Sequence, residues 1–92
     1  MSLLDSNKAI QVSPTYRLQW EETQDMFVLL YPEGLIELNQ SSAEILQVCD
    51  GKNKLNDIVR TLEEKFSVTG LENDINNFLN TALGNGWVTQ SA

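Results

Sequence analysis

Hydrophobic and polar residues alternate in the first half of the chain, and this alternation predicts β-strands. Residues 15–20 place Tyr16, Leu18 and Trp20 on one face of an extended segment. The polar residues 21–25 predict a turn, and the apolar residues 26–31 predict a second strand. We therefore expect consecutive antiparallel strands joined by short turns.

Pro32, Glu33 and Gly34 follow the second strand and predict a tight corner, because Pro fixes φ and Gly tolerates a reversal. In the third predicted strand, residues 35–38, Ile36 and Leu38 share one face. If this strand lies at the sheet edge, its outer N–H and C=O groups are available to an extended partner chain.

Apolar residues recur at helical spacing in the second half of the chain. Asn39 and Ser41 are both good N-cap residues, and Ser41 with Glu44 has the spacing of a capping box. The first helix is short and ends at Asp50-Gly51, since Gly commonly follows the last turn of a helix.

Two longer helices are predicted after this turn. The second starts near Asn56 and directs these residues inward: Ile58, Val59, Leu62 and Phe66. Thr69 and Glu72 form another possible capping box before the third and longest helix, which ends at residues 84–86. Its apolar residues are Leu71, Ile75, Phe78, Leu79, Ala82 and Leu83. Trp87-Val88 is expected to fold back as a short extended tail.

The domain organisation follows from these elements. Residues 1–14 show no sustained period, so they are interpreted as a flexible N-terminal arm, and residues 15–92 as a single domain. Three strands followed by three helices predict an α+β fold, with a winged-helix-like arrangement of a three-stranded antiparallel sheet and a helical trio.

Charge and composition exclude several classes of function. The net charge of −7 over 92 residues disfavours nucleic acid as a partner, and the predicted third helix contains no Lys or Arg. No apolar run approaches the ~20 residues that span a bilayer, so no membrane association is expected. A single cysteine and no histidine are compatible with a cytoplasmic protein and provide no zinc or thiol-protease constellation.

Candidate chemistry is scarce, which argues against an enzyme. Cys49 lies on the apolar face of a predicted helix and is interpreted as a core residue. Glu33 and Glu37 are interpreted as solvated charges, and the glycines at 84 and 86 follow a helix, unlike those of a phosphate loop. No cofactor or metal is expected. An apolar groove beside the edge strand, formed by Ile75, Phe78 and Leu79, is the remaining candidate site.

Several groups of residues match one pattern. They are Arg17-Leu18-Gln19-Trp20, Val28-Leu29-Leu30-Tyr31-Pro32-Glu33-Gly34, Leu38-Asn39, Ala43-Glu44-Ile45-Leu46, Cys49-Asp50-Gly51, Ile58-Val59, Asp74-Ile75 and Gly86-Trp87. Together they closely resemble the PqqD family, the D proteins of pyrroloquinoline quinone (PQQ) biosynthesis.

The resemblance implies a peptide chaperone, in which the domain binds the precursor peptide of PQQ by strand addition. It then presents this peptide to a radical S-adenosylmethionine (SAM) enzyme, which performs the Glu–Tyr cross-linking. The implied peptide-binding residues are Glu33, Gly34, Leu35, Ile36, Glu37 and Leu38 in the third strand, with Asp74, Ile75, Phe78 and Leu79 in the third helix.

Rival interpretations are a regulatory or DNA-binding winged helix, a small enzyme and a dimerisation module. The chain is compatible with a monomer or with a dimer, including a domain-swapped dimer, because an exposed edge permits strand pairing between copies. A concentration of basic residues offers a surface for the radical SAM enzyme: Lys52, Lys54, Arg60 and Lys65.

Overall fold

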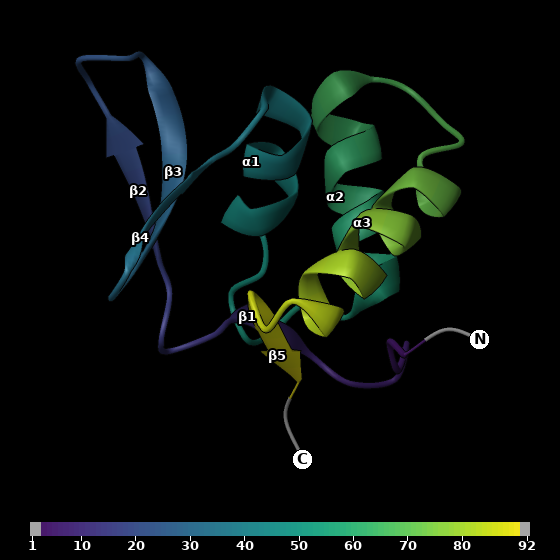
Figure 1. The fold of residues 1–92 in the computed structure, drawn as a ribbon. Helices are drawn as coiled ribbons and strands as arrows, with labels where there is room; N and C mark the ends of the chain where they lie inside the picture. Colours follow the sequence, from purple (N-terminus) through teal and green to yellow (C-terminus); the bar gives the residue numbers. More distant parts are fainter. Residues whose placement is uncertain (1–2, 91–92) are drawn as a thin grey trace.

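The computed structural model describes residues 3–90 of the chain. Its elements, in chain order, are β1 (Ile10–Val12), β2 (Arg17–Glu21), β3 (Met26–Tyr31), β4 (Gly34–Glu37), α1 (Gln40–Gln47), α2 (Leu55–Phe66), α3 (Glu72–Gly84) and β5 (Val88–Gln90). Figure 1 shows α1 between the sheet of β2, β3 and β4 on one side and helices α2 and α3 on the other. The predicted α+β order of three strands and then three helices is confirmed, with β1 and β5 added at the two ends.

The main sheet is antiparallel in the order β2-β3-β4. Leu29, at the centre of β3, pairs with Leu18 of β2 on one side and Ile36 of β4 on the other. Leu29 is fully buried, because α1 packs against β3. Tyr31 pairs with Gly34, so the corner predicted at residues 32–34 is a two-residue turn at Pro32 and Glu33, and Gly34 already belongs to β4.

The helix starts differ in part from the predicted ones. Asn39 caps α1, since its Oδ1 accepts the N–H of Ser42 at 2.8 Å; the Ser41–Glu44 capping box is wrong, because Ser41 lies inside the helix. Neither does Thr69 cap α3. The N–H of Leu71 instead donates to Oε2 of Glu63, with 3.0 Å between the two atoms. Glu63 lies in the last turn of α2.

The connection between α1 and α2 contains the predicted left-handed glycine, but α1 ends earlier than predicted, at Gln47, so Cys49 lies after the helix and not on its face. Gly51 has φ of 84°, and a Cβ atom there would lie 2.9 Å from Oε1 of Gln11. The carboxylate of Asp50 accepts the backbone N–H groups of Lys52 and Asn53, and these hydrogen bonds lower the pKa of Asp50. The positive φ therefore favours Gly at position 51, whereas the close atom belongs to the flexible end of the Gln11 side chain, which can move aside.

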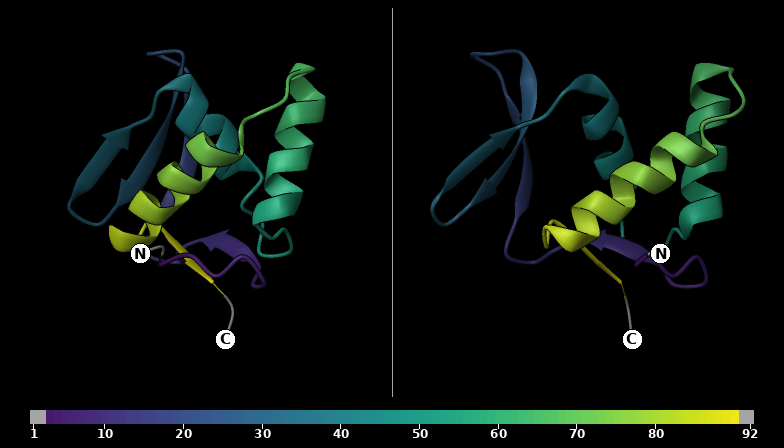
Figure 2. Two further views of the ribbon diagram at one scale, coloured as in Figure 1. Left: turned by 90° about the vertical axis from the view of Figure 1, so that its right-hand side faces the viewer. Right: turned by 45° about the vertical axis from the view of Figure 1, so that its right-hand side comes forward.

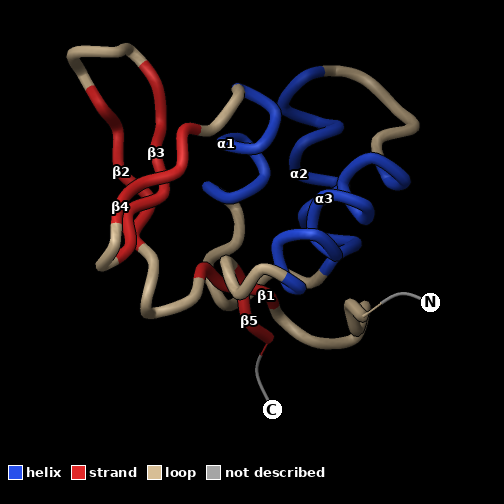
Figure 3. Tube along the Cα trace, in the orientation of Figure 1, coloured by secondary structure: helices blue, strands red, loops and turns tan. Residues whose placement is uncertain are grey.

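The N-terminal segment is a correction to the predicted flexible arm. Ile10–Val12 form β1, which pairs antiparallel with β5, and Ile10 is fully buried. The Ile10 N–H also donates to the carbonyl of Asn53 at 2.9 Å, so β1 lies between β5 and the α1–α2 connection. Figure 3 shows this second, smaller sheet apart from the main one. The pairing joins the two ends of the sequence, and a local pattern of polar and apolar residues does not reveal it.

The core gathers residues from every helix and from both sheets. Its members with no measurable exposure include Ile10, Leu29, Ile58, Leu79 and Ala82. Phe66 is a second correction, because it was predicted to point inward and its side chain is 43% exposed. It is the last residue of α2, and Ser67 then turns the chain with φ of 54°.

Candidate functional site

Among residues 3–90, strand β4 pairs with β3 alone and therefore forms an edge of the main sheet. The N–H of Leu38 donates to the carbonyl of Phe27 at 3.1 Å, and Ile36 pairs with Leu29. Hydrogen-bonded pairs alternate along an antiparallel ladder. The backbone N–H and C=O groups of Leu35 and Glu37 therefore point away from β3.

Side chains of β4 and its flanks are divided between the two faces. Leu38 is buried and Ile36 is half-buried against the core, whereas Glu33, Gly34, Leu35 and Glu37 are exposed. Leu35 is 48% exposed, which is high for a leucine, and it lies next to the free backbone edge. An extended peptide on this edge would thus meet backbone partners and an apolar side chain together.

The four α3 residues that the resemblance implies as peptide-binding have different environments. Ile75 and Leu79 are core residues, with 3% and 0% exposure. Phe78 is half-buried and its ring centroid lies 6.5 Å from that of Trp87, while Asp74 is exposed. Phe78 and Asp74 are therefore the two of these four that offer appreciable surface to a ligand.

Helix α3 packs on α2 and β5, and α1 occupies the space next to β3. The two views in Figure 2 show α3 crossing the molecule from the end of α2 towards the small sheet. The residues of β4 and those of α3 thus belong to separate walls, with α1 following directly from β4 between them.

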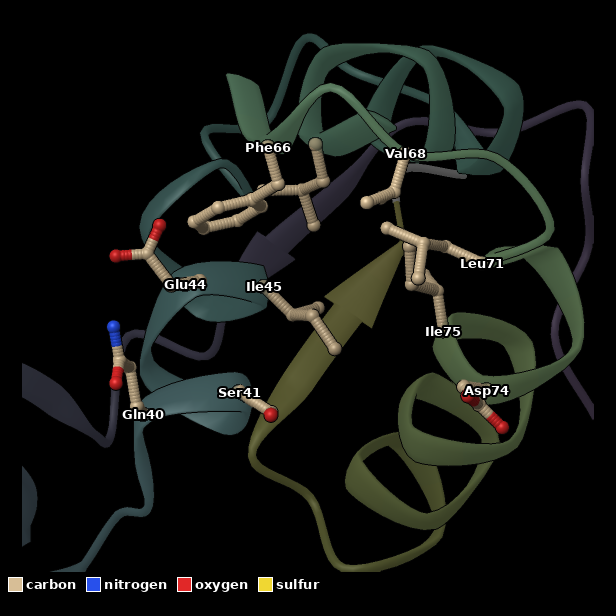
Figure 4. Close-up of a pocket in the computed structure, with 10 residues that line it drawn as sticks. Gln40, Ser41, Glu44, Ile45, Phe66, Val68, Leu71, Asp74 and Ile75 are labelled. Carbon is tan, nitrogen blue, oxygen red and sulfur yellow. The ribbon is translucent and has the colours of Figure 1, made fainter. Parts of the chain in front are cut away.

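A cavity of about 330 Å³ opens between α1, the end of α2 and the start of α3 (Figure 4). It includes Asp74 and Ile75 of the predicted site and none of the β4 residues. The lining residues are Gln40, Ser41, Glu44, Ile45, Leu62, Phe66, Val68, Leu71, Asp74 and Ile75.

Phe66 and Val68 are site residues that the sequence analysis missed. Their side chains are 43% and 44% exposed, and both line the cavity. The sequence holds one usable signal, since Val68 and Leu71 are two apolar residues in the short connection between α2 and α3.

Two carboxylates, those of Glu44 and Asp74, line the cavity, and a third, Glu63, holds the chain beside it. Glu44 forms an ion pair with Lys65, with 2.6 Å between Oε2 and Nζ, and Lys65 Nζ lies 5.5 Å from the centre of the Phe66 ring. Glu63 accepts the N–H of Leu71. Asp74, in the first turn of α3, makes no ion pair within residues 3–90.

The thiol of Cys49 lies in the core, outside the cavity. The Sγ of Cys49 is buried and donates to the carbonyl of Ile45 at 3.3 Å. Burial, with a smaller contribution from the charge of Asp50, raises the pKa of the Cys49 thiol to about 12. Within the described part of the chain there is no cluster of His, Cys, Asp and Glu suited to a metal ion. No helix among those residues is long and apolar enough to cross a membrane.

Comparisons with known proteins agree with this picture. The family model described as coenzyme PQQ synthesis protein D (PqqD) matches residues 27–88. A PqqA binding protein of Methylococcus capsulatus (strain Bath) is 46% identical over 87 residues, which cover 95% of this chain and 94% of the relative. A PqqA binding protein of Pseudomonas aeruginosa (strain PAO1) is 40% identical over 89 residues, covering 96% and 97%.

Two solved structures share the fold. The NMR structure of the PqqD truncation of Methylobacterium extorquens PqqCD has a TM-score of 0.77 at 21% identity, and 96% of each chain is covered. The heterocyclase TruD has a TM-score of 0.70 at 24% identity, with 92% of this chain but 12% of that chain covered.

The first of these structures is described as a recognition element for ribosomally synthesized and post-translationally modified peptides (RiPPs), and the present chain has the fold of that class. The family model spans more than half of the chain, and close relatives cover nearly all of it. The chain belongs to the PqqD family.

Proposed function

We propose that this chain is a non-catalytic recognition element of PQQ biosynthesis, which binds the precursor peptide PqqA and presents it to a radical SAM enzyme. The observation that carries the proposal is the free edge of β4, where the backbone groups of Leu35 and Glu37 point outward. Relatives that cover nearly the whole chain are named PqqA binding proteins.

In the proposed complex the peptide adds as a strand along residues 33–38, on the side away from β3. Helix α3 supplies the second wall, with Phe78 and Asp74 at the surface and Ile75 and Leu79 supporting them from the core. This arrangement is β-augmentation, in which backbone pairing sets the register and side chains set the affinity.

Energetics require both parts of the site. Leu35 and Glu37 together offer four outward backbone groups, and a hydrogen bond contributes a net ~0.5–1.5 kcal/mol, so pairing supplies about 2–6 kcal/mol. Association and ordering of a flexible peptide cost about 4–15 kcal/mol. Apolar contacts, at ~1.5–3 kcal/mol for a fully buried side chain, must therefore decide the affinity.

The strand hypothesis is tested by comparing Glu37→Pro with Glu37→Ala. The alanine variant loses the exposed side chain only, whereas proline also removes an N–H that points away from β3 and leaves the β3–β4 ladder intact. We expect isothermal titration with PqqA to show a Kd that rises at least about threefold for Glu37→Pro and less than about twofold for Glu37→Ala.

Circular dichroism establishes that both variants are folded. An NMR titration of the parent with PqqA adds the location, with the largest amide shifts expected for Leu35 and Glu37. Equal affinities of the two folded variants, or shifts confined to the basic region from Lys52 to Lys65, contradict strand addition at β4.

A reconstitution tests the presenting role. PqqA, the radical SAM enzyme and this chain are combined, and cross-linked PqqA is measured by mass spectrometry. We expect the yield to fall when the chain is omitted or replaced by Glu37→Pro, and to stay near the parental value with Glu37→Ala. Equal yields in all four mixtures contradict presentation.

A further inference from the structure

We infer that the cavity between α1, α2 and α3 receives one apolar side chain of the bound peptide, from a residue that directly neighbours a Lys or Arg. This inference rests on the proposed function and deepens it. It specifies which feature of the peptide is recognised, namely an apolar residue next to a Lys or Arg. The residues that bind this feature lie outside β4.

The interior of the cavity is apolar. Six apolar residues line it: Ile45, Leu62, Phe66, Val68, Leu71 and Ile75. Figure 4 shows Phe66 and Val68 above the cavity and Ile45 and Ile75 projecting towards it from opposite sides. Its volume of about 330 Å³ is at the lower end of the range of ligand pockets and leaves room for a complete apolar side chain.

The exposure of Phe66 and Val68 points to an occupant. Both side chains are more than two-fifths exposed at one opening, while Ile45 and Ile75 beside them are 7% and 3% exposed. Two apolar side chains that remain in water at the mouth of an apolar cavity lose this exposure when an apolar group enters, which stabilises the complex.

The position of the cavity connects it to the free edge of β4. Gln40 and Ser41, which line the cavity, follow the last β4 residue, Glu37, by three and four positions. An extended chain advances about 3.3 Å per residue. A peptide paired with Glu37 therefore reaches the start of α1 within a few residues of the paired segment.

The carboxylates that line the cavity favour a positively charged residue next to the apolar side chain of the peptide. Glu44 and Asp74 lie on opposite sides of the cavity (Figure 4), and Glu44 is already paired with Lys65. Asp74 is exposed and makes no ion pair with any residue from 3 to 90. On a chain of net charge −7, a cation next to the anchor gains the attraction of Asp74 without displacing Lys65.

Asp74 also stabilises the N-terminus of α3 through the helix dipole. Glu72 provides the matched control, since it is exposed, lies in the same first turn and does not line the cavity. Asp74→Asn and Glu72→Gln thus make the same change of charge at the same helix end. Only Asp74→Asn changes the mouth of the cavity.

The test measures Kd for synthetic PqqA and for a PqqA variant with every Lys and Arg replaced by Gln. At low salt we expect Asp74→Asn to raise the Kd for unmodified PqqA about threefold. Glu72→Gln is expected to change this Kd less than about 1.5-fold. At about 1 M salt, where the Debye length is near 3 Å, the difference disappears. The Gln-substituted peptide binds Asp74→Asn and the parent equally.

The apolar part is tested with Phe66→Ala and Val68→Ala, which alter exposed side chains and leave the core in place. Each is expected to weaken PqqA binding about tenfold. Leu3→Ala, which truncates a 67% exposed leucine outside the cavity, is the control and binds like the parent. Circular dichroism melting confirms that all variants are folded.

The outcomes separate this inference from the proposed function. If the parent fails to bind PqqA, both are overturned. If the parent binds and Glu37→Pro weakens binding, but Phe66→Ala, Val68→Ala and Asp74→Asn bind like the parent, the cavity inference alone is overturned. The same holds if Phe66→Ala abolishes concentration-dependent dimerisation in sedimentation while PqqA binding is unchanged, because the occupant is then a second copy.

Discussion

Cys49 shows how one buried side chain links packing to pH. Burial raises its pKa to about 12, from an ordinary value of 9.0. The unfolded chain therefore releases the thiol proton above about pH 9, while the folded chain retains it. Since the native state then binds more protons, stability falls as pH rises from about 9 towards 12. We expect urea unfolding to show this decline in the parent and a smaller one in Cys49→Ala.

The same variant separates structure from function. At neutral pH, Cys49→Ala is expected to lower the free energy of unfolding by about 1–2 kcal/mol through lost packing and to leave PqqA binding nearly unchanged. Thiol reagents are expected to modify the parent much faster in urea than in buffer. Fast modification of the folded protein, or lost binding at unchanged stability, contradicts a purely structural role.

Phe66 shows where residue periodicity stops being informative. It follows Leu62 by four positions, so the helical pattern directs both to one face. Leu62 is 2% exposed, yet Phe66 is 43% exposed, because α2 extends one turn beyond the core at that end. The pattern gives the direction of a side chain and does not give the distance to the next element.

At the scale of elements, the start of α1 provides a clear comparison between two capping residues. Asn39 Oδ1 accepts the N–H of Ser42, whereas Ser41 lies in the first turn and is exposed. Asn39→Ala is expected to cost about 1 kcal/mol of stability, and Ser41→Ala to stay within about 0.5 kcal/mol of the parent. Chemical denaturation measures both, and a larger loss for Ser41→Ala contradicts the assignment of the cap.

These element boundaries indicate what local sequence determines. Strands β2, β3 and β4, the corner after Tyr31, the three helices and the glycine turn at Gly51 were predictable, since each rests on a short-range pattern or a backbone requirement, whereas β1 was not. The start of α3 was not, because the acceptor for Leu71 N–H is Glu63, eight residues earlier on another helix. The cavity shares this property, as its lining comes from three helices and a connection.

At the scale of the whole molecule, the charge distribution opposes nucleic acid binding. The chain has 13 acidic and 6 basic residues, and α3 contains neither Lys nor Arg. Binding to DNA requires cations that displace the counterions of the phosphates. We expect no retention on duplex DNA in a filter-binding assay at physiological salt, and micromolar, salt-sensitive retention contradicts this expectation.

The two ends of the chain close the fold together, because β1 pairs with β5 and fills the core with Ile10. Leu4 is also buried, and the N–H groups of Leu3 and Leu4 donate to Oδ1 of Asn80 on α3. We expect Ile10→Ala to cost about 2–5 kcal/mol, since a large buried side chain leaves a cavity when truncated. Removing residues 1–12 is expected to cost more, as it also removes the β1–β5 ladder.

Urea unfolding followed by circular dichroism tests this dependence, with Leu3→Ala as a control that changes an exposed side chain of the same segment. Small domains are stable by about 5–15 kcal/mol, so the truncated chain is expected to be partly or fully unfolded. Its affinity for PqqA then falls although the deleted residues lie outside β4 and the cavity, and Leu3→Ala retains both stability and binding. A truncated chain that unfolds at the parental urea concentration shows that the segment is a dispensable arm, because the core then tolerates the loss of Ile10.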